Sequence, residues 1–167
     1  MDDQGDRQDY SRNPTIEDLI KLCKSLNDAG VQYVVIGGFA VAHQGFMRTT
    51  GDIDLLIDSS PDNVEKVRKA LVYLKDKAVL EVKPTDVQNY TVVRVADEIV
   101  IDLLEKACGV TYHQIKEDLD PAVIQGVKIP FIGLRSLVLT KQSLRPQDVS
   151  DRAFLEEKIR QIKDQER

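Results

Sequence analysis

The sequence lacks long apolar runs, a basic N-terminus and an excess of positive charge, and each absence excludes a class of protein. Its longest nearly unbroken apolar run, from Tyr33 to Ala42, is about half the length that a membrane-spanning helix needs. Residues 1–14 are polar and acidic, so they predict no secretory signal, and the cytoplasm is the expected compartment. A formal net charge of -5 argues against nonspecific binding to nucleic acid, which depends on clustered Lys and Arg.

Cysteine is also scarce. Cys23 and Cys108 lie far apart, each in an apolar stretch, and no second Cys or His stands at the spacing of a zinc site. Both are therefore predicted to be small buried hydrophobic residues. With 167 residues, the chain is long enough to build one core. We expect a disordered tail over residues 1–14, a single domain over residues 15–163 and a frayed end over residues 164–167.

Two common ligand-binding motifs are missing. The chain has no Gly-Lys dipeptide and so no P-loop, and the glycines after its first apolar strand lack the spacing of the dinucleotide fingerprint. A calcium-binding EF-hand loop that started at Asp52 would need a glycine where Ile57 stands and a glutamate where Asn63 stands. A nucleotide or a metal would therefore have to bind in another way.

Apolar periodicity predicts helices and strands that alternate along the chain. Strands are expected at residues 31–36, 52–58, 90–95 and 99–105, the last two as a hairpin, with a second hairpin over residues 123–132. Helices are expected at residues 15–29, 39–44, 61–74, 134–144 and 146–163, while residues 75–87 are ambiguous between strand and loop. This order predicts an α/β (α+β) fold with a mixed β-sheet flanked by helices.

Three aspartates are spaced so that they could share one site. Asp52 and Asp54 begin the predicted strand of residues 52–58, and the side chains of a strand alternate, so both carboxylates point to one face. Asp102 lies inside a later apolar strand, where an unpaired carboxylate would be costly to desolvate. If the two strands are neighbours, the three carboxylates form a cage of hard oxygen ligands, which Mg²⁺ selects. Acidic residues at a strand start are also common because strand ends are solvated, so a structural interpretation stays open.

Two adjacent glycines, Gly37 and Gly38, follow the first apolar strand. Such a pair usually marks a tight turn, although a helix start with bare backbone N–H groups also binds phosphate. Glycines at one strand end and carboxylates on the next strand are together the two halves of a site for a metal-bound triphosphate. The glycines would supply hydrogen-bond donors, and the carboxylates would hold the metal.

These motifs resemble a known superfamily. The stretch IGGFAVAHQGFMRTTGDIDLLID, followed by Asp102 in a later strand, resembles the nucleotidyltransferases that include DNA polymerase beta and the aminoglycoside and lincosamide nucleotidyltransferases. The segment KQSLRPQDVSD is similar to that of AbiEii-type toxins and other minimal nucleotidyltransferases, which carry a Lys-containing helix followed by an Arg and a spaced Asp pair. The resemblance covers residues 31–155 and implies a nucleotidyltransferase fold.

The resemblance also implies roles for the motif residues. Gly37 and Gly38 would hold the triphosphate of the substrate. Asp52 and Asp54 would bind two Mg²⁺ ions, while Asp102 would bind the catalytic ion and help to activate the acceptor. Many members have Gly-Ser at this turn. This chain has Gly38 in place of the serine, so the second residue of the turn would contact phosphate through its backbone alone.

Arg48 and Lys141 are implied as further phosphate contacts, and each has a plainer interpretation. Arg48 lies four residues before Asp52, where a phosphate clamp would sit, but a lone Arg in a loop is more often a solvated charge. Lys141 stands among leucines, so its stem could simply lie along the core. Asp148 and Asp151 are explained by the preference of the first helical turn for acids.

The expected activity is a Mg²⁺-dependent transfer of NMP from an NTP, such as ATP, to an acceptor hydroxyl, with release of pyrophosphate. A tRNA end, a protein hydroxyl or a small molecule such as an antibiotic would all suit this core as acceptor, and the oligomeric state is left open. One alternative is a catalytically silent, nucleotide-binding antitoxin or regulatory partner from a toxin–antitoxin pair. A metal-binding structural domain is a further alternative.

Overall fold

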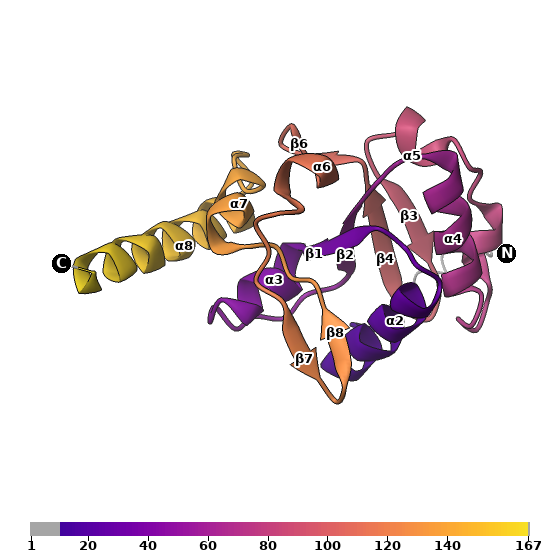
Figure 1. The fold of residues 1–167 in the computed structure, drawn as a ribbon, viewed down its shortest axis with the longest axis horizontal. Helices are drawn as coiled ribbons and strands as arrows, with labels where there is room; N and C mark the ends of the chain where they lie inside the picture. The colour runs from indigo at the N-terminus through magenta and orange to yellow at the C-terminus, as the bar shows by residue number, and fades with distance from the viewer. Residues whose placement is uncertain (1–10, 167) are drawn as a thin grey trace, which may run out of the picture.

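The chain folds around one mixed four-stranded sheet (Figure 1). Along the sequence, helices precede, separate and follow the strands of this sheet. The computed structural model describes residues 11–166, so most of the tail expected at residues 1–14 lies outside the described residues. No helix in this described part of the chain is long and apolar enough to cross a membrane.

The sheet has the strand order β1-β2-β4-β3. The outer strands β1 and β3 run antiparallel to their neighbours, whereas the two central strands, β2 and β4, run parallel to each other. The predicted mixed sheet is therefore confirmed. Its strands are β1 (Tyr33–Ile36), β2 (Ile53–Ile57), β3 (Val93–Ala96) and β4 (Val100–Leu104).

The register of this sheet aligns four residues in one row. Ile36 of β1 pairs with Asp54 of β2, and Asp54 pairs in turn with Asp102 of β4. Asp102 also pairs with Arg94 of β3. Because Gly37 directly follows Ile36, the glycine turn, two aspartates and one arginine follow one another across the sheet.

The helices and smaller strands surround this sheet, and the longest helix, α8, projects from the body of the molecule (Figure 1). The helical elements are α2 (Ile16–Asp28), α3 (Gly37–His43), α4 (Pro61–Leu71), η1 (Ala78–Glu81), α5 (Asp86–Asn89), α6 (Tyr112–Ile115), α7 (Leu134–Leu139) and α8 (Pro146–Gln165). Two small hairpins complete the fold, β5 (Lys106–Ala107) with β6 (Val110–Thr111) and β7 (Ala122–Ile124) with β8 (Val127–Ile129).

One apolar cluster joins α2, α4 and the sheet. Leu22 of α2, Val67 of α4, and Leu55 and Ile101 of the central strands are all fully buried in it. Burying an apolar side chain of this size contributes about 1.5–3 kcal/mol to stability. Since side chains alternate along β2, the burial of Leu55 turns the neighbouring Asp54 to the other face of the sheet.

Several element boundaries differ from the sequence prediction. Residues 75–87 form neither a strand nor a plain loop but the short helices η1 and α5. The helix expected at residues 134–144 ends at Leu139, where the hydroxyl of Thr140 donates to the carbonyl of Leu137 (2.7 Å) and competes with the helical ladder. Residues 106–115 form a hairpin and a one-turn helix that were not predicted, because two-residue strands carry no periodic signal.

The prediction that both cysteines are buried is correct for Cys23 and wrong for Cys108. Cys108 lies in the tight turn between β5 and β6, where its backbone has a φ of 48°. A two-residue hairpin buries little of its own turn, and the Cys108 side chain is exposed. Its thiol donates to the carbonyl of Thr140 (3.3 Å).

Candidate active site

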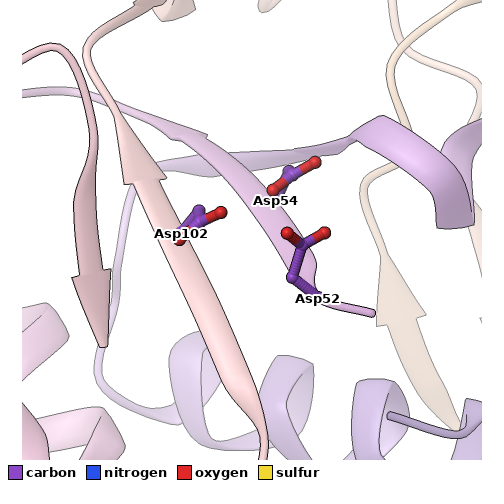
Figure 2. A group of neighbouring side chains, drawn as sticks. All are labelled: Asp52, Asp54 and Asp102. Carbon is purple, nitrogen blue, oxygen red and sulfur yellow. The ribbon is translucent and has the colours of Figure 1, made fainter. Parts of the chain in front are cut away.

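Three carboxylates converge on the face of the sheet that carries Asp54 (Figure 2). Asp52 stands immediately before β2, Asp54 lies within β2, and Asp102 lies at the paired position of β4. Each side chain offers an oxygen, and these oxygens lie within 4.8 Å of one another. The strand was predicted to begin at Asp52, but β2 begins one residue later, at Ile53. The side chains of Asp52 and Asp54 still reach the same site.

The geometry suits a hard divalent cation. All of the donors are carboxylate oxygens, which Mg²⁺ prefers to nitrogen or sulfur ligands. Asp102 is buried and Asp52 and Asp54 are partly buried, so a cation would also relieve the mutual repulsion of three acids in a poorly solvated place. Asp52, Asp54 and Asp102 are therefore the residues that could hold a metal.

Burial and crowding shift the titration of these acids. Burial, followed by the negative charges of Asp52 and Asp102, raises the pKa of Asp54 to about 7, while the charges of Lys141 and Arg94 act in the opposite direction. Burial and the charge of Asp102 also raise the pKa of Asp52. In the absence of a bound cation, the ionised site is therefore under electrostatic strain.

Arg94 is a member of this cluster that the sequence analysis missed. Its guanidinium donates from Nε and Nη2 to the two carboxylate oxygens of Asp102 (both 2.9 Å), and Nη2 also lies 3.4 Å from Asp52 Oδ2. Hydrogen bonding to Asp102, together with its charge, raises the pKa of Arg94. The compensation expected for the buried Asp102 is thus supplied by an arginine on the neighbouring strand. The sequence did contain a signal for this contact, because Arg94 lies on the strand that was predicted to form a hairpin with the strand of Asp102.

Since Arg94 brings a positive charge to the carboxylates, we expect it to compete with a metal. Its side chain is 59% exposed, which leaves room for it to move away. Arg94→Ala should tighten Mn²⁺ binding, measured by calorimetry or by electron paramagnetic resonance, by about 3- to 10-fold, because a charge close to the site is removed. Arg160→Ala, on the exposed part of α8, is the control and should leave the affinity unchanged. Weaker Mn²⁺ binding in Arg94→Ala would mean that the arginine mainly holds the carboxylates in place.

The glycine turn lies against Asp54. Gly37 has a φ of +72°, and a Cβ atom built on it would lie 2.2 Å from Asp54 Oδ2. A Cβ atom on Gly38 would lie 2.7 Å from Thr50 Oγ1 and 3.2 Å from Arg48 Nη1. No side chain caps the start of α3, so the turn brings uncapped backbone beside the acids. Both glycines are therefore required by close approach, in addition to the positive φ of Gly37.

We expect Gly37→Ala to damage both the fold and the site. The left-handed backbone costs a residue with a Cβ atom about 1–2 kcal/mol, and the new methyl group would also displace the Asp54 carboxylate. Urea unfolding should show the loss of stability, and Mn²⁺ titration should show weaker binding. Gly109→Ala is the matched control, since Gly109 also has a positive φ (+80°) but no atom lies within 4 Å of its Cβ position. It should lose similar stability and keep its Mn²⁺ affinity.

Arg48 and Lys141 meet in a buried ion cluster that the sequence did not predict. Arg48 donates from Nε and Nη2 to the carboxylate of Asp151 (3.0 and 2.8 Å). Lys141 Nζ lies 3.2 Å from Asp151 and 3.5 Å from Asp148. Burial acts to raise the pKa of Asp151, but hydrogen bonds from Arg48 and Gln147 and the charge of Lys141 lower it overall. Both aspartates, interpreted from sequence as acids of a first helical turn, thus anchor α8 to the rest of the domain.

This ion cluster changes the plainer interpretation of both cations. Arg48 is neither a purely solvated charge nor free of partners, and Lys141 does not extend to solvent, because its side chain is 9% exposed and ion-paired. Both remain close to the site, since Arg48 Nη1 borders Gly38 and the charge of Lys141 acts on Asp54. Contact with phosphate stays a prediction for both residues.

Comparisons with known proteins bear on the fold and the family of this chain. A comparison with curated proteins found no match. The crystal structure of a "putative nucleotidyltransferase" from Thermotoga maritima is similar with a TM-score of 0.53 and 15% sequence identity, over 87% of this chain and 92% of that chain. At that identity the likeness shows a shared fold. Residues 15–166 match the model of a family described as nucleotidyl transferase of unknown function (DUF2204). The match spans most of the sequence, and the chain therefore belongs to this family of nucleotidyltransferases.

Proposed function

We propose that the protein transfers NMP from an NTP to an acceptor hydroxyl, releases pyrophosphate, and requires Mg²⁺ bound by Asp52, Asp54 and Asp102. The observation that carries this proposal is the convergence of three carboxylate oxygens within 4.8 Å, beside a glycine turn, in a chain of this family. Two Mg²⁺ ions held there would neutralise the triphosphate and the departing pyrophosphate.

The glycine turn would bind the outer phosphates. Gly37 and Gly38 allow the backbone to come close to Asp54 and Thr50, and any larger residue would fill this space. Uncapped N–H groups beside the acids can then donate to phosphate oxygens. Arg48 lies next to Gly38, and its anchoring by Asp151 would hold its guanidinium in place while it contacts the terminal phosphate.

Asp102 would act on the acceptor. As the acceptor oxygen forms its bond to the α-phosphorus and the bond from that phosphorus to the bridging oxygen breaks, the hydroxyl proton passes to the Asp102 carboxylate. Arg94 orients this carboxylate through two hydrogen bonds. Because Asp102 lies in the same row of the sheet as Asp54, it can reach an acceptor bound beside the α-phosphate.

The test is to incubate the purified protein with each α-labelled NTP, Mg²⁺ and a total cell extract. Label should appear in RNA, in protein or in a small molecule, and the product should disappear with EDTA or in Asp54→Asn. Absence of any labelled product with all NTPs would contradict the proposal. NTP binding without transfer, detected by thermal melts, would favour the catalytically silent nucleotide-binding partner instead.

A further inference from the structure

A hydroxyl lies where a side chain on the second glycine of the turn would have to go. A Cβ atom built on Gly38 would lie 2.7 Å from Oγ1 and 2.8 Å from Cβ of Thr50, and 3.2 Å from Arg48 Nη1. Thr50 comes from the loop between α3 and β2. The turn thus carries no hydroxyl of its own, but another segment of the chain places one against it.

The two glycines of the turn face different groups. Gly37 lies against the carboxylate of Asp54, whereas Gly38 lies against two hydrogen-bond donors, the hydroxyl of Thr50 and Nη1 of Arg48. A phosphate at the turn would therefore have the acids that hold a metal on one side and the two donors on the other. Such an arrangement suits a metal-bound phosphate, because the oxygens that do not contact the metal need hydrogen-bond donors.

Both donors have capacity left for a ligand. The Thr50 hydroxyl donates to the backbone carbonyl of Asp52 at 3.1 Å, which is longer than the about 2.7–2.8 Å usual for an O–H···O bond, and a hydroxyl hydrogen can rotate to another acceptor. Nε and Nη2 of Arg48 are fixed on Asp151, whereas the contact of Nη1 is a long one, 3.4 Å to the carbonyl of Thr49. Two nitrogens therefore hold the guanidinium in place, and the third is available.

A ligand can reach these donors. Gly38, Arg48 and Thr50 line one cavity of about 570 Å³ beside α3, so open space rather than packed side chains adjoins them. The rest of the lining is largely apolar and includes Phe39 and Phe131. Because such surroundings are poorly solvated, a hydrogen bond made there to a charged phosphate is stronger than the same bond in water.

We propose that the Thr50 hydroxyl and Arg48 Nη1 together bind the terminal phosphate of the NTP beside Gly38 and so select a triphosphate over a diphosphate. This inference rests on the proposed function, to which it adds a further binding residue. With the α-phosphorus beside Asp102 and the pyrophosphate toward the turn, the phosphate farthest from the attacked atom is the one at Gly38. A diphosphate held at the same α-phosphate would leave both donors without an acceptor. The same geometry explains the glycine at position 38, since any Cβ atom there would displace the hydroxyl.

Calorimetric titration with ATP and with ADP, both with Mg²⁺, tests the role of the hydroxyl. The wild type should prefer ATP by at least about 10-fold. Thr50→Val removes the hydroxyl at nearly constant shape and should weaken ATP binding by at least about 10-fold, the usual contribution of a hydrogen bond to a charged group, while ADP binding should change by less than about 3-fold. Thr50→Ser keeps the hydroxyl and should stay within about 3-fold of the wild type. Thr49→Val, in the exposed neighbouring threonine, is the matched control and should bind both nucleotides normally.

An exchange of side chains between the two positions tests the place of the hydroxyl. Gly38→Ser alone forces a Cβ atom against Thr50, and Thr50→Gly alone removes the hydroxyl, so each should weaken ATP binding by at least about 10-fold. The double variant Gly38→Ser, Thr50→Gly makes room for the serine and returns a hydroxyl to the turn, so its ATP affinity should recover to within about 3-fold of the wild type. Two independent losses of stability would add instead. A double variant no better than the single ones would overturn the placement at Gly38.

Inorganic tripolyphosphate with Mg²⁺ separates this inference from the proposed function, because it carries the phosphates without a nucleoside. Normal ATP binding by Thr50→Val, equal losses of ATP and ADP affinity in that variant, or a wild type without preference for ATP would overturn the role of Thr50 while the transfer stands. Tripolyphosphate binding that depends on the Thr50 hydroxyl, in a wild type that binds no NTP, would support the phosphate site and contradict the transfer. A wild type that binds neither ATP nor tripolyphosphate would overturn both.

Discussion

Asp102→Asn is expected to lower the turnover of NMP transfer by about 10²- to 10⁴-fold, the usual contribution of a general base. The NTP affinity should change by less than about 3-fold, because Asp52 and Asp54 remain to hold the metal-bound triphosphate. Asparagine has nearly the shape of aspartate, and its side-chain oxygen can still accept one hydrogen bond from Arg94. The loss of turnover would therefore reflect the missing proton acceptor rather than a collapsed strand.

Single-turnover transfer and a separate NTP titration measure the two effects independently. Asp28→Asn, in an exposed acid of α2, is the control and should match the wild type in both assays. Equal losses of turnover and of NTP affinity in Asp102→Asn would assign this residue to substrate binding. A variant that turns over normally would remove Asp102 from the mechanism.

The central part of the site could be predicted from the sequence because its signals are local. Alternation along one strand places Asp52 and Asp54 on the same face, and an acid within an apolar strand, such as Asp102, requires a compensating partner nearby. The close pairing of the two glycines with these acids also followed from the motif. None of these inferences needed the exact ends of the strands, so they hold although β2 starts one residue later than predicted.

What the sequence could not give depends on contacts between distant segments. Arg48 and Asp151 are 103 positions apart, and each has an adequate local explanation, one as a loop charge and the other as an acid of a first helical turn. Arg94 required the register of a hairpin, which sets whether it faces Asp102 or points to the opposite side of the sheet. A shift of one residue in that register would have removed the arginine from the site.

Asp54→Asn should make the protein without metal more stable at neutral and higher pH. Burial and the charges of Asp52 and Asp102 raise the pKa of Asp54 from an ordinary 3.8 to about 7, and no hydrogen bond among residues 11–166 holds its carboxylate. A raised pKa means that the folded state binds more protons than the unfolded state between about pH 4 and pH 7, so the free energy of unfolding falls as the pH rises through that window. Complete ionisation should cost on the order of 2–4 kcal/mol.

Asparagine removes this cost, so urea unfolding in EDTA should give the variant its largest advantage near pH 8, with the two proteins nearly equal near pH 4. Mg²⁺ with ATP should reverse the order, because a ligand at about 100 times its Kd stabilises the wild type by roughly 2.7 kcal/mol and the variant binds it poorly. Asp28→Asn should follow the wild type in both conditions. A variant that unfolds more readily than the wild type in EDTA at pH 8, with a wild type indifferent to Mg²⁺ and ATP, would mean that Asp54 supports the fold. Stability gained without metal and lost with it is what distinguishes a binding carboxylate from a structural one.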